Sequence, residues 1–329
     1  MEMRMKNKVL PWIAVACLAI GASGAQASTA DTYPEGPIRI VAPYAPGGAT
    51  DMFARTIAEG LQGAWGKPVV VENRPGASGV IGAENVSRAA ADGYTMVVGA
   101  VSLHSILPSL LENMNKAQDN LTPVSTLANL PSYIVVPANH PAKTIQELIA
   151  LIKAAPDKYT YASAGPGTSQ HVFPELFKQR AGLEILHVPY KGSGAMIVDL
   201  LAGRVDMVIE QGPAVLNHIR KGSLRALAAT TLERTRELPD VPTLDETVLP
   251  GFEANTWFAI YAPKGTPAPI VEKLNKEIGN ILQQPKVKER LENQGAIPMH
   301  RTVAELTRME KEDRAKWLEV IKTGGIKIE

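Results

Sequence analysis

The fold is decided by the stretch Ile38-Arg39-Ile40-Val41-Ala42-Pro43-Tyr44-Ala45-Pro46-Gly47-Gly48-Ala49-Thr50-Asp51. A β-branched run ends at Pro43, a loop with two glycines follows, and a helix is predicted from Thr50 to Trp65 with Thr50 or Asp51 as its N-cap. The helical spacing is carried by four apolar residues, Met52, Phe53, Ile57 and Leu61. Such a strand-loop-helix unit is typical of α/β proteins.

A second junction of the same form is Ala162-Ser163-Ala164-Gly165-Pro166-Gly167-Thr168-Ser169-Gln170. A helix N-terminus has unpaired N–H groups and a partial positive charge, and glycine lets a ligand approach the backbone. Two such loops predict a clamp on a molecule with negative ends. A third junction, residues 189–194, contains Lys191, which we expect to be exposed, and a fourth, residues 74–79, is interpreted as a structural turn.

Strand-like and helix-like blocks alternate along the rest of the chain, whose 329 residues are enough for two domains. A repeated spacing suggests where the chain passes from one domain to the other. Two apolar runs each end in a proline that is followed by a second proline four residues later. Pro137 and Pro141 are matched by Pro263 and Pro267 at a constant offset of 126 residues. We interpret residues 133–137 and 257–263 as strands that cross between two hinged domains.

The N-terminus has the form of a secretory signal peptide. Arg4, Lys6 and Lys8 precede a short apolar stretch, and Ala25-Gln26-Ala27 is an A-x-A site, so cleavage is predicted after Ala27. The one cysteine, Cys17, lies in the apolar stretch, which leaves the mature chain without a thiol. The sequence thus predicts an exported, periplasmic protein, with lipidation of Cys17 as an alternative left open.

Several function classes find no support in the sequence. The net charge is +1 and there is no basic run beyond the first residues, so nucleic-acid binding is not expected. Nucleotide, zinc-protease and nucleophile-elbow motifs are missing, and the six histidines have no i, i+4 pair, so neither a metal nor a cofactor is predicted. An exported α/β hydrolase that uses Ser163 or Ser169 with His171 remains an alternative.

The chain resembles the extracytoplasmic solute receptors of the tripartite tricarboxylate transporter type, the Bug family, over essentially its whole mature length. The matching stretches are Tyr33-Pro34 through Pro43, Pro46-Gly47-Gly48-Ala49-Thr50-Asp51, Asn73-Arg74-Pro75-Gly76-Ala77-Ser78-Gly79, Asp92-Gly93-Tyr94-Thr95, Tyr161-Ala162-Ser163, Gly167-Thr168-Ser169-Gln170-His171, His187-Val188-Pro189-Tyr190-Lys191-Gly192, Leu238-Pro239-Asp240-Val241-Pro242-Thr243, Leu249-Pro250-Gly251-Phe252-Glu253 and Ala262-Pro263-Lys264-Gly265-Thr266-Pro267.

The resemblance implies a type II-like periplasmic-binding-protein fold with two α/β lobes: residues 28–133 with 255–329, and residues 134–254. It implies a receptor, not an enzyme, that closes on a small carboxylate and delivers it as a monomer to membrane permease subunits. Presentation of the ligand to a histidine kinase is an alternative. The site residues expected from the loops and the resemblance together are Tyr44, Gly47, Gly48, Thr50, Asp51, Ser102, His104, Ala164, Gly165, Gly167, Thr168, Ser169, Tyr190 and Glu210.

The sequence departs from the family pattern at three places, and the first two bear on the ligand. Tyr44 replaces a common phenylalanine and adds either a polar contact or a surface hydroxyl. Glu210 would repel a nearby carboxylate unless it is protonated, turned away or paired with a cationic group of the ligand. The alternative is that Glu210 faces solvent and has no role at the ligand. Residues 113–120 are interpreted as a surface loop without a ligand role.

Overall fold

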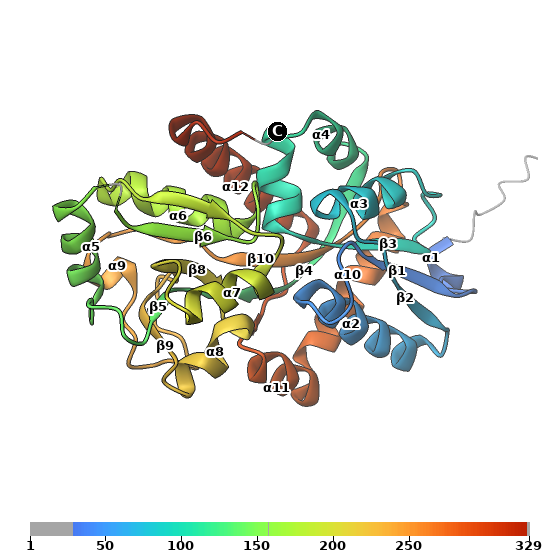
Figure 1. Ribbon diagram of the computed structural model, residues 1–329. Coiled ribbons are helices and arrows are strands. Elements are labelled where there is room, and N and C mark those ends of the chain that lie inside the picture. The colour runs from blue at the N-terminus through green and yellow to red at the C-terminus, as the bar shows by residue number, and fades with distance from the viewer. Residues whose placement is uncertain (1–28, 157, 328–329) are drawn as a thin grey trace, which may run out of the picture.

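The protein contains two β-sheets with helices on their faces, which confirms the predicted α/β class (Figure 1). A computed structural model describes residues 29–156 and 158–327; the predicted signal peptide and Cys17 lie outside them. In chain order the elements are α1 (Thr29–Thr32), β1 (Ile38–Ala42), α2 (Ala49–Trp65), β2 (Val69–Asn73), η1 (Ala77–Gly79), α3 (Val80–Ser87), β3 (Thr95–Ala100), η2 (Ser102–Ile106), η3 (Leu107–Ser109), α4 (Glu112–Gln118), β4 (Leu121–Leu130), β5 (Ser132–Pro137), α5 (Ile145–Ala154), β6 (Thr160–Ser163), α6 (Ser169–Ala181), β7 (Leu186–Pro189), α7 (Ser193–Leu201), β8 (Met207–Gln211), α8 (Gly212–Arg220), β9 (Leu224–Ala229), α9 (Leu244–Thr247), β10 (Thr256–Pro263), α10 (Ala268–Gln283), α11 (Pro285–Asn293), β11 (Ile297–Pro298) and α12 (Val303–Gly324).

The first sheet has the strand order β11-β4-β10-β3-β1-β2, with β1 parallel to β2 and β3, and β10 antiparallel to β3 and β4. All of β10 is buried because both faces of this sheet are covered. Its side chains alternate between two cores: Phe258 and Ile260 pack with α2 and α10, whereas Trp257 and Tyr261 face the core that includes α6 and α12.

The second sheet has the order β7-β6-β8-β5-β9, with β6 parallel to β7 and β8, and β5 antiparallel to β8 and β9. Each sheet therefore inserts one antiparallel strand, β10 or β5, beside three parallel ones. In parallel strand-helix units the loops that follow the strands meet at one edge of the sheet. This arrangement places the glycine loops after β1 and β6 at the edges where the two sheets approach each other.

The chain passes between the sheets twice, at Pro131 and through residues 230–255. Neither β5 nor β10 belongs to both sheets, so the crossing is made by the connecting residues rather than by the strands we expected. The two connections meet where Thr230 donates its backbone N–H to the Ser132 carbonyl (2.9 Å) and its hydroxyl to the Ala254 carbonyl (2.7 Å). The proposed lobe boundary after residue 133 falls inside β5.

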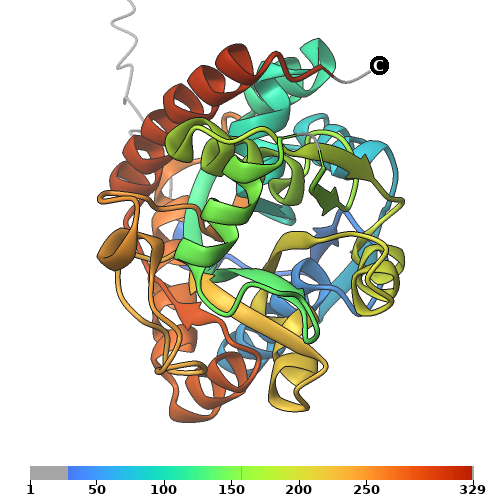
Figure 2. The same cartoon turned by 60° about the vertical axis from the view of Figure 1, so that its left-hand side comes forward.

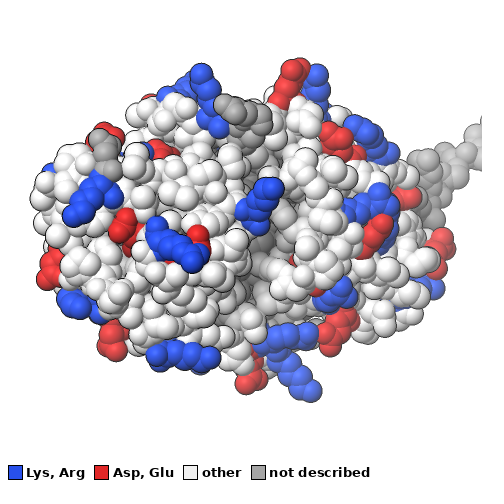
Figure 3. Space-filling model, viewed as in Figure 1, with Lys and Arg blue, Asp and Glu red and all other residues white. Residues whose placement is uncertain are grey.

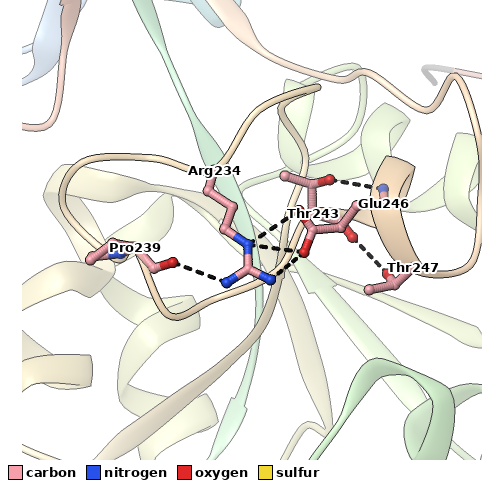
Figure 4. A network of polar contacts seen from close by, with 5 residues as sticks. All are labelled: Arg234, Pro239, Thr243, Glu246 and Thr247. Carbon is pink, nitrogen blue, oxygen red and sulfur yellow. Dashed lines mark hydrogen bonds and ion pairs between the residues drawn. The ribbon is translucent and has the colours of Figure 1, made fainter.

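The longer connection is held in shape by Arg234. Its guanidinium pairs with the Glu246 carboxylate and donates to the Pro239 carbonyl at 3.2 Å (Figure 4). Thr243 caps α9 by accepting the Glu246 N–H at 3.0 Å. Exposed ion pairs contribute little to stability on their own, but here the pair closes a loop against a capped helix turn. Side-chain contacts thus join Arg234, near the start of the connection, to the α9 turn in its middle.

Helix α12 lies along the outside of the molecule and packs on both halves (Figures 1 and 2). It contacts η2 and β4 of the first half and α6 of the second. Its Trp317 is fully buried and stacks on Phe173 of α6, with ring centroids 5.0 Å apart. A third link between the two halves is therefore made by side-chain packing.

Residues 113–120 are largely helical, so the interpretation as a surface loop is wrong. They form most of α4, whose Met114, Ala117 and Gln118 are buried. The asparagines and Asp119 favour turns in isolation, but Met114 and Ala117 pack against α3 and η3, and Gln118 hydrogen-bonds His104 and Glu310, so tertiary contacts stabilise the helix.

Candidate functional site

A cavity of about 440 Å³ opens where the loops of the two sheets face each other. In the space-filling view a furrow separates the two halves of the molecule, and charges of both signs are scattered on either side (Figure 3). The cavity is lined by Tyr44, Gly48, Ala49, Thr50, Ser78, Ala100, Ser102, Leu107, Ala164, Gly167, Thr168, Ser169, Gln170, Lys191, Gly192, Ser193, Gln211, Thr256 and Phe258.

Four helices begin at this cavity. The N-caps of α2, α6, α7 and α8 are Gly48, Thr168, Gly192 and Gln211, and all four residues line it. The N-cap of α2 is thus Gly48, not Thr50 or Asp51 as predicted. No side chain caps any of the four helices, whereas threonines cap α5, α9 and α12 elsewhere. The first N–H groups of α2, α6 and α7 are therefore free to bind an anion. In α8 the Gly212 N–H donates to the Pro131 carbonyl at 3.2 Å and Pro213 has no N–H, so this helix contributes the Gln211 side chain to the cavity instead.

The loop before α2 is held by the Asp51 carboxylate. Oδ2 accepts the Gly47 N–H and the Arg55 Nε–H, both at 3.0 Å, and Oδ1 accepts from Asn73 Nδ2 at 3.0 Å. Burial would raise the pKa of Asp51, but the hydrogen bonds from Arg55, Gly47 and Asn73 lower it. Gly47 and Asp51 do not line the cavity, so Asp51 serves to shape the loop that does.

The loop before α6 turns at two glycines, with φ of +129° at Gly165 and +75° at Gly167. The Thr168 hydroxyl donates to the Gly165 carbonyl at 2.7 Å. The Gly165 N–H donates to Ser163 Oγ at 3.2 Å, and the Gly167 N–H donates to His171 Nδ1 at 3.2 Å. Both glycine N–H groups are thus used inside the protein, and the free backbone donors of this loop are those of the first turn of α6.

The two expected tyrosines make contacts within the protein. The Tyr44 hydroxyl donates to the Ser78 carbonyl at 2.9 Å, and both residues line the cavity. The Tyr190 hydroxyl donates to the Asp199 carboxylate at 2.8 Å, and Tyr190 does not line the cavity.

Glu210 lies behind the cavity wall and is only 1% exposed. Its Oε1 accepts from Gln170 Nε2 at 2.9 Å and from the Gln211 N–H at 2.7 Å, and burial raises its pKa. Gln211 in turn donates from Nε2 to Ser169 Oγ at 3.3 Å and to Thr256 Oγ1 at 3.0 Å. Of the alternatives left open, the carboxyl is turned away from the cavity, and its role is to orient the amides that line it.

His104 does not reach the cavity either. It is fully buried, stacks on Tyr261 with ring centroids 3.7 Å apart, and hydrogen-bonds Gln118 of α4 through Nδ1. Burial lowers its pKa to about 3, so it is a neutral core side chain. Its neighbours Ser102 and Leu107 are the residues of this segment that line the cavity.

Gly99 provides room for this histidine, and Gly99→Ala is expected to destabilise the protein by about 1–3 kcal/mol. A Cβ at this position would lie 1.9 Å from His104 Nε2 and 2.9 Å from Tyr261 Cε2. Both stacked rings are fully buried, so we expect the added methyl group to displace His104 and, with it, the cavity wall at Ser102. Urea unfolding measures the loss, and Gly63→Ala, with nothing within 4 Å of the added Cβ, is the control. Equal stability of the two variants would contradict the prediction.

Sequence reasoning missed several lining residues. Lys191 is exposed, as predicted, but it was not counted among the site residues, and it is the one charged side chain that lines the cavity among the described residues. Gln211 and Ser193 stand at strand-to-helix junctions, so the signal that located the glycine loops applies to them as well. Thr256 and Phe258 lie within β10, and no local pattern marks them.

The hydrolase alternative gains no support from the geometry. Ser163 is fully buried and contacts His187, not His171, while the Ser169 hydroxyl contacts Gln170 and Gln211. Within residues 29–156 and 158–327, no group of three or more His, Cys, Asp or Glu side chains is placed to hold a metal ion. No helix in the same ranges has the length and apolar character needed to cross a membrane.

Comparison with known proteins identifies the family. A family model described as "Tripartite tricarboxylate transporter family receptor" matches residues 53–326. Protein BugT of Bordetella pertussis is 40% identical over 322 residues, which cover 96% of this chain and 98% of that protein.

Solved structures of similar proteins include R. palustris Rpa4515 with adipate, with a TM-score of 0.81 and 35% identity over 90% of this chain and 99% of that one. Another is MatC from Rhodopseudomonas palustris with bound malate, with a TM-score of 0.77 and 31% identity over 88% and 100% of the two chains. Periplasmic binding protein BugD has a TM-score of 0.77 and 35% identity, covering 90% and 99%. The resemblance stated from the sequence is confirmed, and the chain belongs to the tripartite tricarboxylate transporter receptor family.

Proposed function

We propose that this protein is a periplasmic receptor that binds a small carboxylate in the cavity between its sheets and delivers it to the membrane subunits of a tripartite transporter. The observation that carries the proposal is the meeting of three helix N-termini with free N–H groups, those of α2, α6 and α7, at one cavity. Among the described residues, no acidic side chain lines this cavity. Helix ends and neutral hydroxyls bind an anion without the large desolvation cost of a buried cation.

The proposed mechanism is closure of two lobes on the ligand. The α2 end belongs to the first sheet, and the α6, α7 and α8 ends belong to the second, so one ligand contacts both halves only when they are close. A ligand that binds the closed form more tightly shifts the population toward it. The connections at Pro131 and residues 230–255 are the proposed hinge. The bound ligands of Rpa4515 and MatC support a dicarboxylate as the first candidate.

The test is thermal stabilisation and calorimetry of the chain from Ser28 across mono-, di- and tricarboxylates, amines and neutral sugars. Ligand at a hundredfold excess over its Kd should stabilise the native state by about 2.7 kcal/mol. Stabilisation by carboxylates alone is the expected result. Stabilisation by amines or sugars in place of carboxylates would overturn the proposal.

Lys191 is positioned for the second anionic end of such a ligand. We expect Lys191→Met to raise the Kd for dicarboxylates about three- to tenfold and to leave monocarboxylate binding nearly unchanged, because an exposed ammonium contributes modestly. Lys221→Met, an exposed lysine at the far end of α8, is the control. An equal loss for both ligand types would mean that Lys191 acts on the shared carboxylate or on the loop.

A further inference from the structure

Two stacked imidazoles lie beneath the loop between β6 and α6. The ring centroids of His171, in the first turn of α6, and His187, on β7, are 4.0 Å apart with planes at 11°. His187 also stacks against Tyr161 of β6, at 4.8 Å and 15°. His171 is 7% exposed, and neither histidine lines the cavity. The pair therefore does not reach the space where a ligand would bind.

Each imidazole holds one glycine of the loop. His171 Nδ1 accepts the Gly167 N–H directly at 3.2 Å. His187 Nε2 shares a 2.7 Å hydrogen bond with Ser163 Oγ, which accepts the Gly165 N–H at 3.2 Å. Both glycines have positive φ, so the backbone at these two points depends on specific contacts to keep its course.

The other glycine loop is built in the same way with a different acceptor. There the Gly47 N–H donates to the Asp51 carboxylate, also four residues later and in the first turn of the following helix. Asp51 is ionised and paired with Arg55, which offsets its charge. His171 has no such partner and, as a neutral acceptor, adds no negative charge at the N-terminus of α6, so the positive end of that helix stays available to an anion.

The surroundings keep the pair neutral. Burial, and secondarily the Lys178 ammonium, lowers the pKa of His171 to about 4. Burial and the neighbouring His171 lower the pKa of His187 to about 4, against the opposing effect of Glu175. A neutral His171 that accepts at Nδ1 carries its proton on Nε2.

We propose that His171, supported by its stacking on His187, is a positioning residue of the anion site: it fixes the Gly167 N–H and so aims the N–H groups of Ser169 and Gln170 into the cavity. The proposal rests on the function proposed above. It assigns no ligand contact to either imidazole.

Two substitutions separate the acceptor from the bulk of the ring. In His171→Asn the side-chain oxygen falls near the position of Nδ1 and can accept the Gly167 N–H, whereas His171→Leu keeps an apolar volume and no acceptor. His140→Leu is the matched control, because the buried His140 also accepts a backbone N–H at Nδ1, from Ala142 at 3.2 Å, and does not line the cavity.

The first measurement uses the protein without ligand. Amide hydrogen exchange by NMR should show Gly167 protected in wild type and His171→Asn, and exchanging at least tenfold faster in His171→Leu. The second is calorimetry with adipate and malate: His171→Leu should raise the Kd tenfold or more, His171→Asn less than threefold, and His140→Leu should leave it unchanged.

Equal loss of affinity in the Asn and Leu variants would overturn the proposal, because the ring volume and not the acceptor would then matter. So would unchanged Gly167 exchange in His171→Leu. If wild type binds no carboxylate, the proposed function fails, and the exchange data still decide whether His171 holds the loop.

Discussion

Replacing Ala49 with proline is expected to weaken carboxylate binding ten- to hundredfold while changing the free energy of unfolding by less than about 1 kcal/mol. Ala49 is the first residue of α2 and lines the cavity, so its N–H is one of the free donors. Proline removes that N–H and is favoured at this helix position. The preceding Gly48 is already extended, with φ of −83° and ψ of 176°, as a residue before proline requires. A lost hydrogen bond to a charged group costs about 1.5–3 kcal/mol.

The same backbone deletion can be made on the opposite wall. Ser169→Pro removes the first N–H of α6, and Thr168 before it is extended, with φ of −76° and ψ of 162°. Ala49→Ser and Ser169→Ala keep the N–H groups and are the matched controls. Calorimetry gives the Kd, and urea unfolding confirms that the fold is retained. Wild-type affinity in both proline variants would show that the helix ends do not bind the ligand.

The second large effect concerns the buried Glu310 of α12. We expect Glu310→Gln to change the free energy of unfolding, and this change should be about 3 kcal/mol more stabilising at pH 8 than at pH 4.5. Burial raises the pKa of this carboxyl to about 7, while Arg314 and the Tyr261 hydroxyl act in the opposite direction. Its oxygens accept from Gln118 Nε2 and, at 3.4 Å, from the Tyr261 hydroxyl.

The sign follows from the raised folded-state pKa. The protonated form is favoured in the native state, so stability is fully present below the ordinary pKa of 4.5 and is lost as the pH rises toward 7. Glutamine cannot ionise, so its curve should lack this loss. Unfolding by urea between pH 4.5 and 8 measures both curves, and Glu312→Gln, an exposed acid on the same helix, should follow wild type. Parallel curves for wild type and Glu310→Gln would contradict the prediction.

The glycine loops could be located from the sequence because their signal is local. A strand, two glycines and an amphipathic helix follow one another in the chain, and the N-terminus of that helix must face outward from the end of the sheet. Gly48, Thr50, Thr168 and Ser169 were therefore identified, and all four line the cavity.

The remaining site depends on contacts between distant residues. His104 is two positions from the lining residue Ser102, but η2 turns its ring inward onto Tyr261, and only the packed structure reveals that contact. Glu210 lies on a strand whose first four residues are all buried, so alternation did not indicate which way it points. The helix at residues 112–118 forms against the low propensity of its asparagines because tertiary packing buries one face.

The sequence by itself thus determined the α/β class, the family and the two glycine loops, since each is encoded by neighbours in the chain. The tertiary structure alone decided which side chains face the cavity, that Glu210 and His104 stay behind its walls, and that His171 holds Gly167. The physical reason is that a side chain's direction is set by the burial and hydrogen bonds available around it, and those partners come from strands and helices far away in the sequence.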